Sequence, residues 1–205
     1  MSLYGKHVLP WLIDVVGKEK SAADLRKRLI PSARGVVVEI GMGSALNMPF
    51  YSARAVTQLF GIDPSAELLS MARPKIEGSP FPIELLHQTA DDVPLGDQTV
   101  DTVVTTWVMC SIVNLRHVLR EMKRVLKRDG QLLFIEHGLS PDPRVQKWQN
   151  RIAPIWSRVS GGCCVNKKID DLICGSGFTL TELENLYIPG PRPLKYIYQG
   201  FARPN

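Results

Sequence analysis

The sequence is poor in the features that mark secreted and membrane proteins. Its 205 residues include only four cysteines, and their spacing matches no disulfide framework. The first residues lack a charged stretch followed by an apolar run and a small-residue cleavage site. No apolar run approaches the roughly 20 residues that span a bilayer. We therefore expect reduced thiols, a cytoplasmic location and no transmembrane anchor.

Linkers, internal repeats and low-complexity tracts are also lacking. With 44% hydrophobic and 22% charged residues, the chain can bury a core of single-domain size. We expect one domain over 1–205. Its predicted parts are N-terminal helices (1–34), a ligand-binding core (35–138), a lid (139–168) and a C-terminal helix with a strand pair (169–205).

The basic balance of the chain comes without a nucleic-acid-binding pattern. The net charge is +5 and the pI is about 9.1. Much of the excess lies on one predicted amphipathic helix near 115–128, which Gly130 would end. No aromatic stripe interleaves with these charges to stack bases. We interpret the helix as having a solvated outer face and expect no nucleic-acid partner.

What the sequence does contain is an alternation of strand and helix patterns. Helical stripes at 8–16 and 22–30 come first. Apolar runs that could be buried on both faces follow, and two further runs flank the turn-rich PGPRP near the end. The pattern predicts an α/β fold: a doubly wound, Rossmann-like, seven-stranded and mostly parallel sheet with an antiparallel C-terminal strand. The expected strands are 36–40, 57–62, 82–87, 100–106, 131–137, 178–188 and 194–202.

The most informative motif is the run VVVEIGMG at 36–43. An apolar strand that leads directly into Gly41 and Gly43 is typical of a tight strand-to-helix turn, where the backbone can approach a ligand closely. Asp63 follows the next strand, and its carboxylate could accept hydrogen bonds from both hydroxyls of a ribose. The motif therefore predicts a nucleotide-like ligand.

Two ligand classes compete for this turn. A dinucleotide site needs a third Gly or Ala near the helix N-terminus, but that position is Leu46, and Pro49 would break a long helix starting at Gly43. Glu39 adds a negative charge, which suits a ligand with an ammonium and a sulfonium better than a pyrophosphate. A dinucleotide is disfavoured, although an NAD-linked oxidoreductase stays open as an alternative.

The ordered motifs resemble those of class I S-adenosylmethionine-dependent methyltransferases, whose first motif has the form ExGxG. The resemblance covers most of 30–200 and includes TADDVPL (89–95), VDTVVTTWVMCSI (100–112) and LREMKRVLKRDGQLLFIEHG (119–138). It implies S-adenosylmethionine as methyl donor and S-adenosylhomocysteine as product. It also implies that Asp63 binds the ribose and that 89–95 contacts the adenine.

Ligands of such sheets lie beyond the carboxyl ends of the strands, and this rule selects the candidate donor-binding residues. Asp63 has a second interpretation as a helix N-cap. Asp91 is the weaker candidate, because family members often carry the adenine-binding acid where Thr89 stands here. The predicted donor-binding residues are Glu39, Gly41, Met42, Gly43, Asp63, Pro64, Thr89, Ala90, Asp91, Thr105 and Thr106.

Methyl transfer from a sulfonium can proceed through proximity and orientation alone, so no strong nucleophile or metal is required. A base is needed only if the acceptor arrives protonated. His137, at the end of a predicted strand, is the candidate catalytic residue, because an imidazole changes charge near neutral pH. Its alternative role is structural, as a hydrogen-bonding partner of the loop that begins at Gly138.

The acceptor site is expected under the lid at 139–168, where apolar residues recur at helical spacing before GGCCVN. Pro154 and Gly161–Gly162 would permit bends. The alternative is that these aromatic residues belong to the core. An apolar pocket favours a small hydrophobic acceptor. The predicted acceptor-binding residues are Trp107, Cys110, Trp148, Trp156, Cys163, Asn166 and Tyr196.

The cysteines do not predict a metal site. Cys163 and Cys164 are adjacent, so they cannot form the two-residue-spaced chelate of a zinc knuckle. Cys110 could face the donor sulfur, yet a free cysteine is more often a small buried apolar residue. We expect no bound metal, and an acceptor such as arsenite is disfavoured.

Within the family, the segments TTWVMCSI, LLFIEHG, GGCCVN and YIPGPRPLKYIYQG are most similar to type-11 methyltransferases that resemble the animal thiol S-methyltransferases. Ubiquinone and menaquinone C-methyltransferases are more loosely similar. The animal proteins carry an N-terminal hydrophobic anchor, whereas this chain offers only the stripe at 8–16, so we expect at most peripheral membrane contact. A thiol is the leading acceptor. A phenol or quinone precursor and a non-catalytic donor-binding role are the alternatives.

Overall fold

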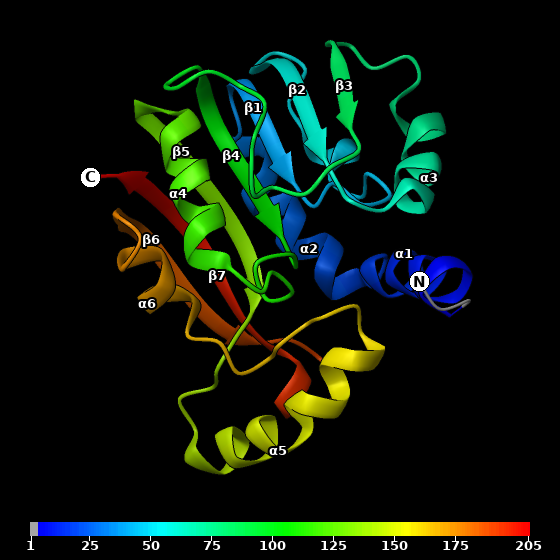
Figure 1. Ribbon diagram of the computed structural model, residues 1–205, viewed down its shortest axis with the longest axis vertical. Coiled ribbons are helices and arrows are strands. Elements are labelled where there is room, and N and C mark those ends of the chain that lie inside the picture. The colour runs from blue at the N-terminus through cyan, green and yellow to red at the C-terminus, as the bar shows by residue number, and fades with distance from the viewer. Residues whose placement is uncertain (1–3) are drawn as a thin grey trace.

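The computed structural model describes residues 4–205, apart from the side chains of residues 6 and 7, and is built around one seven-stranded sheet (Figure 1). The order across the sheet is β3-β2-β1-β4-β5-β7-β6. The strands are β1 (Gly35–Ile40), β2 (Val56–Ile62), β3 (Ile83–Leu86), β4 (Val100–Thr106), β5 (Leu126–His137), β6 (Phe178–Tyr187) and β7 (Tyr196–Pro204).

The strands β1 to β5 pair with one another in parallel, and β7 is antiparallel to both β5 and β6. This arrangement confirms the predicted mostly parallel sheet with an antiparallel C-terminal strand. Because β1, β2, β4 and β5 run in the same direction, their carboxyl ends meet at one edge of the sheet. A ligand at this edge can contact residues that are far apart in the sequence.

Helices cover both faces of the sheet, which explains why the parallel strands are apolar throughout. Alternate strand residues face opposite sides, so that Val38 packs with α4 (Leu115–Val125) and α6 (Ile169–Cys174). On the other face, Val37 packs with α2 (Lys20–Leu29) and α3 (Ala66–Ile76). Each such aliphatic side chain contributes about 1.5–3 kcal/mol by leaving water.

The basic helix α4 ends earlier than its pattern predicts. Its last residue is Val125, and β5 starts at once with Leu126. Gly130 is therefore a strand residue, and the prediction that it ends the helix is wrong. A Cβ at Gly130 would lie 2.9 Å from the carbonyl oxygen of Lys127 and 3.2 Å from that of Asp101, so crowding against the backbone explains the glycine.

The connection from β1 to β2 contains no α-helix. Residues 41–47 form turns, and η3 (Met48–Phe50) is a single 3₁₀ turn. This agrees with the expectation that Pro49 prevents a long helix after Gly43, because proline cannot donate the backbone hydrogen bond that a helix interior needs. The glycine turn at 41–43 is thus followed by compact loop structure and not by an α-helix.

Three further helical segments border the carboxyl edge of the sheet. η1 (Tyr4–Val8) and α1 (Leu9–Gly17) lie to the right of the sheet in Figure 1, and α5 (Pro143–Val159) lies below it. The Tyr4 hydroxyl donates to the Val159 carbonyl at 2.7 Å, which joins the start of η1 to the end of α5. Between residues 4 and 205, no helix combines the length and the apolar character needed to cross a bilayer.

Candidate active site

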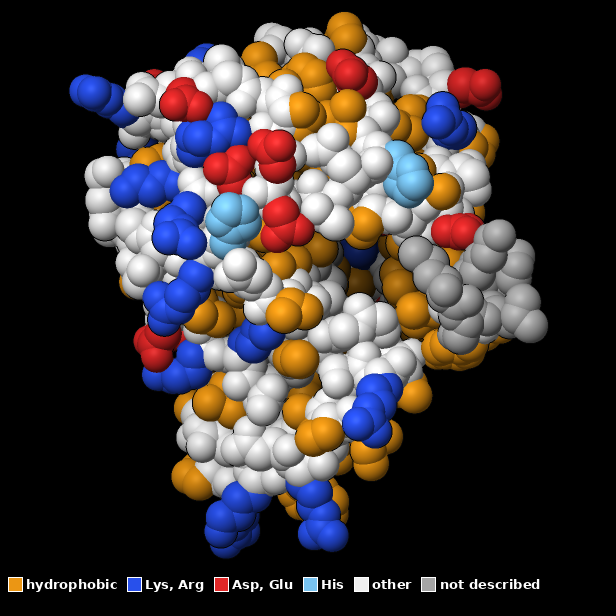
Figure 2. All heavy atoms as spheres, in the orientation of Figure 1, with side chains coloured by type: hydrophobic (Ala, Val, Ile, Leu, Met, Phe, Trp, Pro, Cys, Tyr) orange, Lys and Arg blue, Asp and Glu red, His pale blue; other side chains and the backbone are white. Residues whose placement is uncertain are grey.

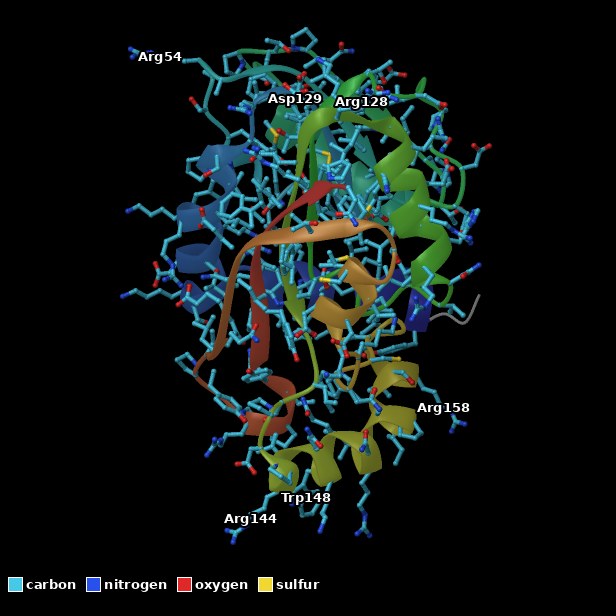
Figure 3. All side chains as sticks on the ribbon, turned by 90° about the vertical axis from the view of Figure 1, so that its left-hand side faces the viewer. Arg54, Arg128, Asp129, Arg144, Trp148 and Arg158 are labelled. Carbon is cyan, nitrogen blue, oxygen red and sulfur yellow. The ribbon has the colours of Figure 1, made fainter. Side chains whose placement is uncertain are left out.

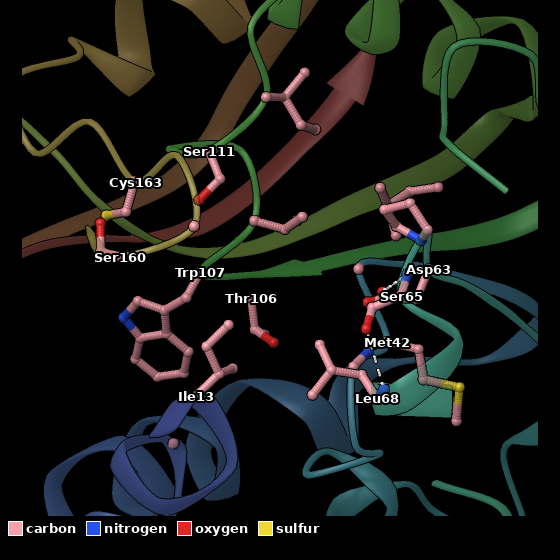
Figure 4. A pocket seen from close by; sticks show the side chains of 18 of the residues that line it. Ile13, Met42, Asp63, Ser65, Leu68, Thr106, Trp107, Ser111, Ser160 and Cys163 are labelled. Atoms are coloured by element: carbon pink, nitrogen blue, oxygen red, sulfur yellow. Dashed lines mark hydrogen bonds between the residues drawn. The ribbon is translucent and has the colours of Figure 1, made fainter. Parts of the chain in front are cut away.

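A cavity of about 900 Å³ opens at the carboxyl ends of β1, β2, β4 and β5. Figure 2 shows the surface hollowed at this place, with hydrophobic side chains around the opening. Figure 4 shows two ends of the cavity: Met42, Asp63 and Leu68 lie on one side, and Trp107, Ser111 and Cys163 lie on the other. We call these sides the Asp63 end and the Trp107 end.

At the Asp63 end, the turn after β1 requires glycine. Gly41 has φ +70°, and a Cβ at this position would lie 2.4 Å from Cγ2 of Val108. Gly43 also has a positive φ, +56°, but a Cβ there would lie in nearly open space. Met42 between them is buried against Gly61 of β2. The turn therefore brings bare backbone to the cavity wall, as the sequence predicts.

Asp63 ties this turn to the end of β2. One carboxylate oxygen accepts from the backbone N–H of Gly43, and the other accepts from that of Ser65, both at 2.8 Å. Burial raises the pKa of Asp63, against the opposite effect of these two hydrogen bonds. The N-cap of α3 is Ser65, whose hydroxyl accepts from Leu68. Asp63 also lines the cavity, and its two carboxylate oxygens can accept further hydrogen bonds.

Glu39 is the buried carboxylate beneath the turn. It accepts hydrogen bonds from the Asn47 amide at 2.8 Å and from the Tyr51 hydroxyl at 2.7 Å. The Arg26 guanidinium donates to Asn47 at 2.9 Å and thereby completes the network. Burial raises the pKa of Glu39 to about 7, although both hydrogen bonds and Arg26 act in the opposite direction. Asn47, Tyr51 and Arg26 were not predicted as site residues, since only their folded positions connect them to Glu39.

The predicted adenine-binding segment also reaches the cavity. Pro64 and residues 89–91 line its wall. Ala90 is buried, whereas Thr89 and Asp91 are exposed. The backbone carbonyl of Asp91 accepts from His117 of α4 at 2.7 Å, which fixes the loop without using the Asp91 side chain.

The two neighbouring threonines at the end of β4 have different positions. Thr106 lines the cavity, and its hydroxyl accepts from Asn47 at 3.1 Å. Thr105 is fully buried within the sheet and is not part of the cavity wall. Adjacent strand residues point to opposite faces, so only one of the two predicted threonines can line the cavity.

At the Trp107 end, the loop after β4 is held in an unusual conformation. Trp107 has φ +57°, which is rare for a large side chain. Its indole lines the cavity, and the guanidinium carbon of Arg26 lies 4.7 Å above the ring centroid. Glu136 is fully buried and accepts from the backbone N–H groups of Val108, Met109 and Cys110 at 3.0–3.2 Å. These contacts hold the loop in place.

His137 and Cys163 line the same end of the cavity, and the fully buried Cys110 lies next to them. The Cys163 sulfur is 3.5 Å from Nδ1 of His137. The interaction with Cys163, together with burial, raises the pKa of the Cys110 thiol well above its usual value. The predicted base and two predicted acceptor residues are therefore brought together, although they are far apart in the sequence.

Three other predicted acceptor residues lie away from the cavity wall. Trp148 is 58% exposed and points outward from α5 beside Arg144 (Figure 3). Asn166 donates to Asn150 at 3.0 Å. Tyr196 is buried on the α4 side of the sheet, where its ring packs against Tyr187 and Tyr198. Within the predicted lid, only Trp156, 159–161 and Cys163 reach the cavity, so Trp148, Asn166 and Tyr196 are not kept in the candidate site.

The wall opposite the sheet is α1, which the sequence analysis did not assign to the site. Leu9, Leu12, Ile13 and Val16 of this helix line the cavity. A signal was available, because residues 8–16 are apolar around most of the helix circumference rather than on one face. Such a helix has more than one apolar neighbour to contact.

The buried residue Asp14 fixes α1 to the rest of the site. Its carboxylate accepts from the Ser44 hydroxyl at 2.5 Å and pairs with Lys75 of α3 at 3.0 Å. Lys18, which directly follows α1, forms a second salt bridge with Asp14. Burial alone would raise the pKa of Asp14, but its partners Lys18, Ser44 and Lys75 outweigh burial and lower it to about 2. Asp14 is therefore ionised at neutral pH and holds α1 against the turn at 41–44.

Several known methyltransferases are similar to this chain. Residues 38–134 match the methyltransferase domain family Methyltransf_11. The chain is 28% identical to human thiol S-methyltransferase TMT1B over 171 residues, which cover 82% of this chain and 68% of that protein. It is 36% identical to phosphatidylethanolamine N-methyltransferase of Cereibacter sphaeroides over 125 residues, 59% of this chain and 60% of that protein. The matched regions thus cover 68% and 60% of the lengths of these two relatives.

Solved structures show the same fold. A S-adenosylmethionine-dependent methyltransferase from Leishmania major superposes with a TM-score of 0.72 and 13% sequence identity, covering 98% of this chain and 80% of that chain. The match of residues 38–134 to the methyltransferase domain family favours the methyl donor over the dinucleotide alternative. Residues 38–134 are therefore a methyltransferase domain of the type-11 group on a class I methyltransferase fold, and its cofactor is S-adenosylmethionine.

Proposed function

We propose that the enzyme methylates a small apolar thiol, with the donor at the Asp63 end of the cavity and the acceptor at the Trp107 end. Bound S-adenosylmethionine supplies a methyl group on positively charged sulfur. Backbone at Gly41 and Gly43 can approach it closely, because no Cβ fills the turn. The remaining lone pairs of Asp63 suit the ribose hydroxyls, and 89–91 would border the adenine.

Glu39 gives the Asp63 end a negative charge that suits a cationic donor. It lines the cavity, although Asn47 and Tyr51 donate to its oxygens. A sulfonium and an ammonium nearby favour the ionised carboxylate. We expect Glu39 to lose its proton when the donor binds.

The observation that carries the choice of acceptor is the composition of the Trp107 end. Its walls are the aliphatic residues of α1 together with Trp107 and Trp156, and His137 and Cys163 add an imidazole and a thiol. An apolar surface of this kind favours a small hydrophobic molecule over a sugar or a nucleotide. The enclosing walls would align the acceptor atom with the methyl group, and proximity supplies most of the acceleration.

A thiol acceptor must lose its proton, since the thiolate is the nucleophile. His137 is positioned to accept it, because this residue lines the cavity at the end of β5. The similarity to the human thiol S-methyltransferase TMT1B supports a thiol. The similarity to the phosphatidylethanolamine N-methyltransferase makes an amine the acceptor to test against it.

The test is a panel of small apolar acceptors of matched carbon skeleton that carry a thiol, a phenolic hydroxyl or an amine. Methyl transfer from labelled S-adenosylmethionine is measured for each. We expect turnover of the thiol with at least about tenfold higher kcat/KM than the others, which corresponds to about 1.4 kcal/mol. Preferred methylation of the phenol or the amine would overturn the thiol assignment. Binding of S-adenosylhomocysteine with no turnover of any acceptor would favour a donor-binding protein without catalysis.

A further inference from the structure

Cys110, His137 and Cys163 form a compact cluster of three soft or borderline donor atoms. Their sulfur and ring nitrogen atoms all lie within 4.8 Å of one another. They come from three separate parts of the chain: the loop after β4, the end of β5 and the segment after α5. Methyl transfer to a thiol needs at most one of these groups as a base, so the cluster is larger than the proposed reaction requires.

The spacing of the cluster fits one metal ion. With zinc–sulfur and zinc–nitrogen bonds of about 2.3 and 2.0–2.1 Å, a tetrahedral site separates sulfur from nitrogen by about 3.6 Å and sulfur from sulfur by about 3.8 Å. Cys163 Sγ lies 3.5 Å from His137 Nδ1. No donor pair exceeds 4.8 Å, so shifts of about 1 Å or less complete this geometry.

The backbone around the three donors is held by buried side chains. Glu136 accepts from the Cys110 N–H at 3.2 Å, and the Cys110 carbonyl accepts from the Cys164 N–H at 3.0 Å. The Gln149 amide is fully buried and donates to the carbonyls of Gly138 and Val165, both at 2.9 Å. Each of the three metal-binding residues is thus next to a fixed backbone position. Because the backbone is already held in place, the cluster loses little conformational entropy when an ion binds.

We propose that Cys110, His137 and Cys163 bind one thiophilic divalent cation, with Zn²⁺ as the reference ion. Binding of the ion replaces the S–H bonds of Cys110 and Cys163 with metal–sulfur bonds and releases both protons to solvent. The resulting two thiolates and one imidazole are a ligand set of catalytic zinc sites, which keep a fourth position open. Magnesium and calcium prefer oxygen ligands and do not suit this set. His137 and Cys163 line the cavity, so the open position faces the acceptor.

The fourth ligand in this proposal is the acceptor thiol, and this part rests on the proposed function. Coordination forms a metal–sulfur bond and breaks the S–H bond, and the released proton passes to solvent. With the ion bound, the acceptor is held as a thiolate by the metal, and His137 acts as a ligand of the ion instead of the base that it is in the metal-free enzyme. The cation site itself stands whether or not the acceptor is a thiol.

The first experiment measures Zn²⁺ binding to the reduced full-length protein by competition with a chromogenic chelator. We expect one equivalent per chain. C163S, C110S and H137Q should each weaken the affinity by at least about 100-fold, since loss of an outer-shell partner alone costs 10–100-fold. C164S and C174S are matched controls, because Cys164 is adjacent to the site and Cys174 is exposed on α6. Both should retain wild-type affinity.

Folding of each variant is checked by S-adenosylhomocysteine binding, which uses the other end of the cavity. If C110S does not fold, C163S and H137Q still test the site, because both residues line the cavity, whereas Cys110 is fully buried behind it. The proposal is overturned if the reduced wild type binds no stoichiometric Zn²⁺. It is also overturned if C163S and H137Q bind the ion as tightly as C164S does.

The second experiment tests the fourth ligand. Co²⁺ replaces Zn²⁺, and its absorption spectrum is recorded with the apolar thiol and with the alcohol of the same skeleton. A new sulfur-to-cobalt charge-transfer band that appears with the thiol and not with the alcohol supports the proposal. Unchanged spectra overturn the acceptor role and leave the cation site. Stoichiometric Zn²⁺ binding in a protein that methylates no thiol would instead mean that the proposed function has failed.

Discussion

The two ends of the cavity are built in different ways. The Asp63 end uses residues close in sequence, because Glu39, Gly41, Gly43 and Asp63 all lie in or directly after β1 and β2. The Trp107 end combines α1, the loop after β4, the end of β5 and the segment after α5. The comparison teaches that a local motif can define the donor site, whereas the acceptor site depends on how distant segments pack.

The largest expected effect concerns the buried charge at the Asp63 end. The pKa of Glu39 is raised from its ordinary value of 4.5 to about 7, so the folded protein binds an extra proton between these values. The resulting stabilisation is fully present below about pH 4.5 and is lost as the pH rises through 7, by up to about 3 kcal/mol. The free energy of unfolding of wild type should therefore fall relative to that of E39Q over this range. A difference between the two proteins that is constant with pH would contradict it.

Next in size is the loss of the carboxylate that joins the turn to β2. D63A removes the acceptor of the Gly43 and Ser65 N–H groups and the proposed ribose contact. Hydrogen bonds to charged groups contribute about 1.5–3 kcal/mol, so S-adenosylhomocysteine affinity should fall about 100-fold in calorimetry. D92A is the control, because Asp92 is exposed and lies outside the cavity wall. Equal affinities of D63A and wild type would mean that the Asp63 end does not hold the donor.

The glycine turn is tested by a pair of substitutions with the same backbone penalty. Gly41 and Gly78 have φ of +70° and +73°, but only a Cβ at Gly41 meets an atom within 4 Å, in the side chain of Val108. Both alanine variants should lose about 1–2 kcal/mol from the positive φ. G41A should lose more in thermal unfolding and should also bind S-adenosylhomocysteine more weakly. If G78A destabilised the protein as much as G41A, the contact with Val108 would not matter.

The smallest effect distinguishes the two tryptophans of α5. Trp156 lines the cavity and Trp148 is exposed outside it. W156A should lower kcat/KM for the acceptor about tenfold, or about 1.4 kcal/mol, and leave S-adenosylhomocysteine affinity unchanged. W148A should change neither quantity. A loss of donor affinity in W156A would show that the two ends are not separate, and an acceptor effect in W148A would move the site outward along α5.

The mostly parallel sheet and the glycine turn after β1 could be predicted because their physical causes are local. Alternating helices and doubly buried strands indicate a parallel sheet, and Pro49 excludes a helix after Gly43 wherever the segment lies in the fold. The directions of the Thr105 and Tyr196 side chains do not have local causes. Each side chain's direction depends on where its strand begins and which face the neighbouring strands present, and one residue of shift reverses it.

The error at α5 has a different cause. The apolar stripe with Trp148 and Ile155 was interpreted as facing inward, yet the buried residues are Val145, Gln149 and Ala153. A glutamine can be the inward residue because its amide satisfies Ser140, Gly138 and Val165 in the backbone. Those partners come from loops whose positions the sequence does not reveal. Cys110, His137 and Cys163 are each predicted at the acceptor site, but the sequence does not show that their sulfur and nitrogen atoms meet, for the same reason.

The contacts of Asp14 connect the two ends of the cavity. The Ser44 hydroxyl that Asp14 holds comes directly after the donor turn, and Lys75 also donates to the Ser44 carbonyl at 2.7 Å. Any ligand that moves this turn therefore changes the contacts that hold α1, and α1 is a wall of the Trp107 end. The affinities for the two substrates are then linked, and the linkage is reciprocal. In steady-state kinetics, the KM for the acceptor should depend on the concentration of S-adenosylmethionine.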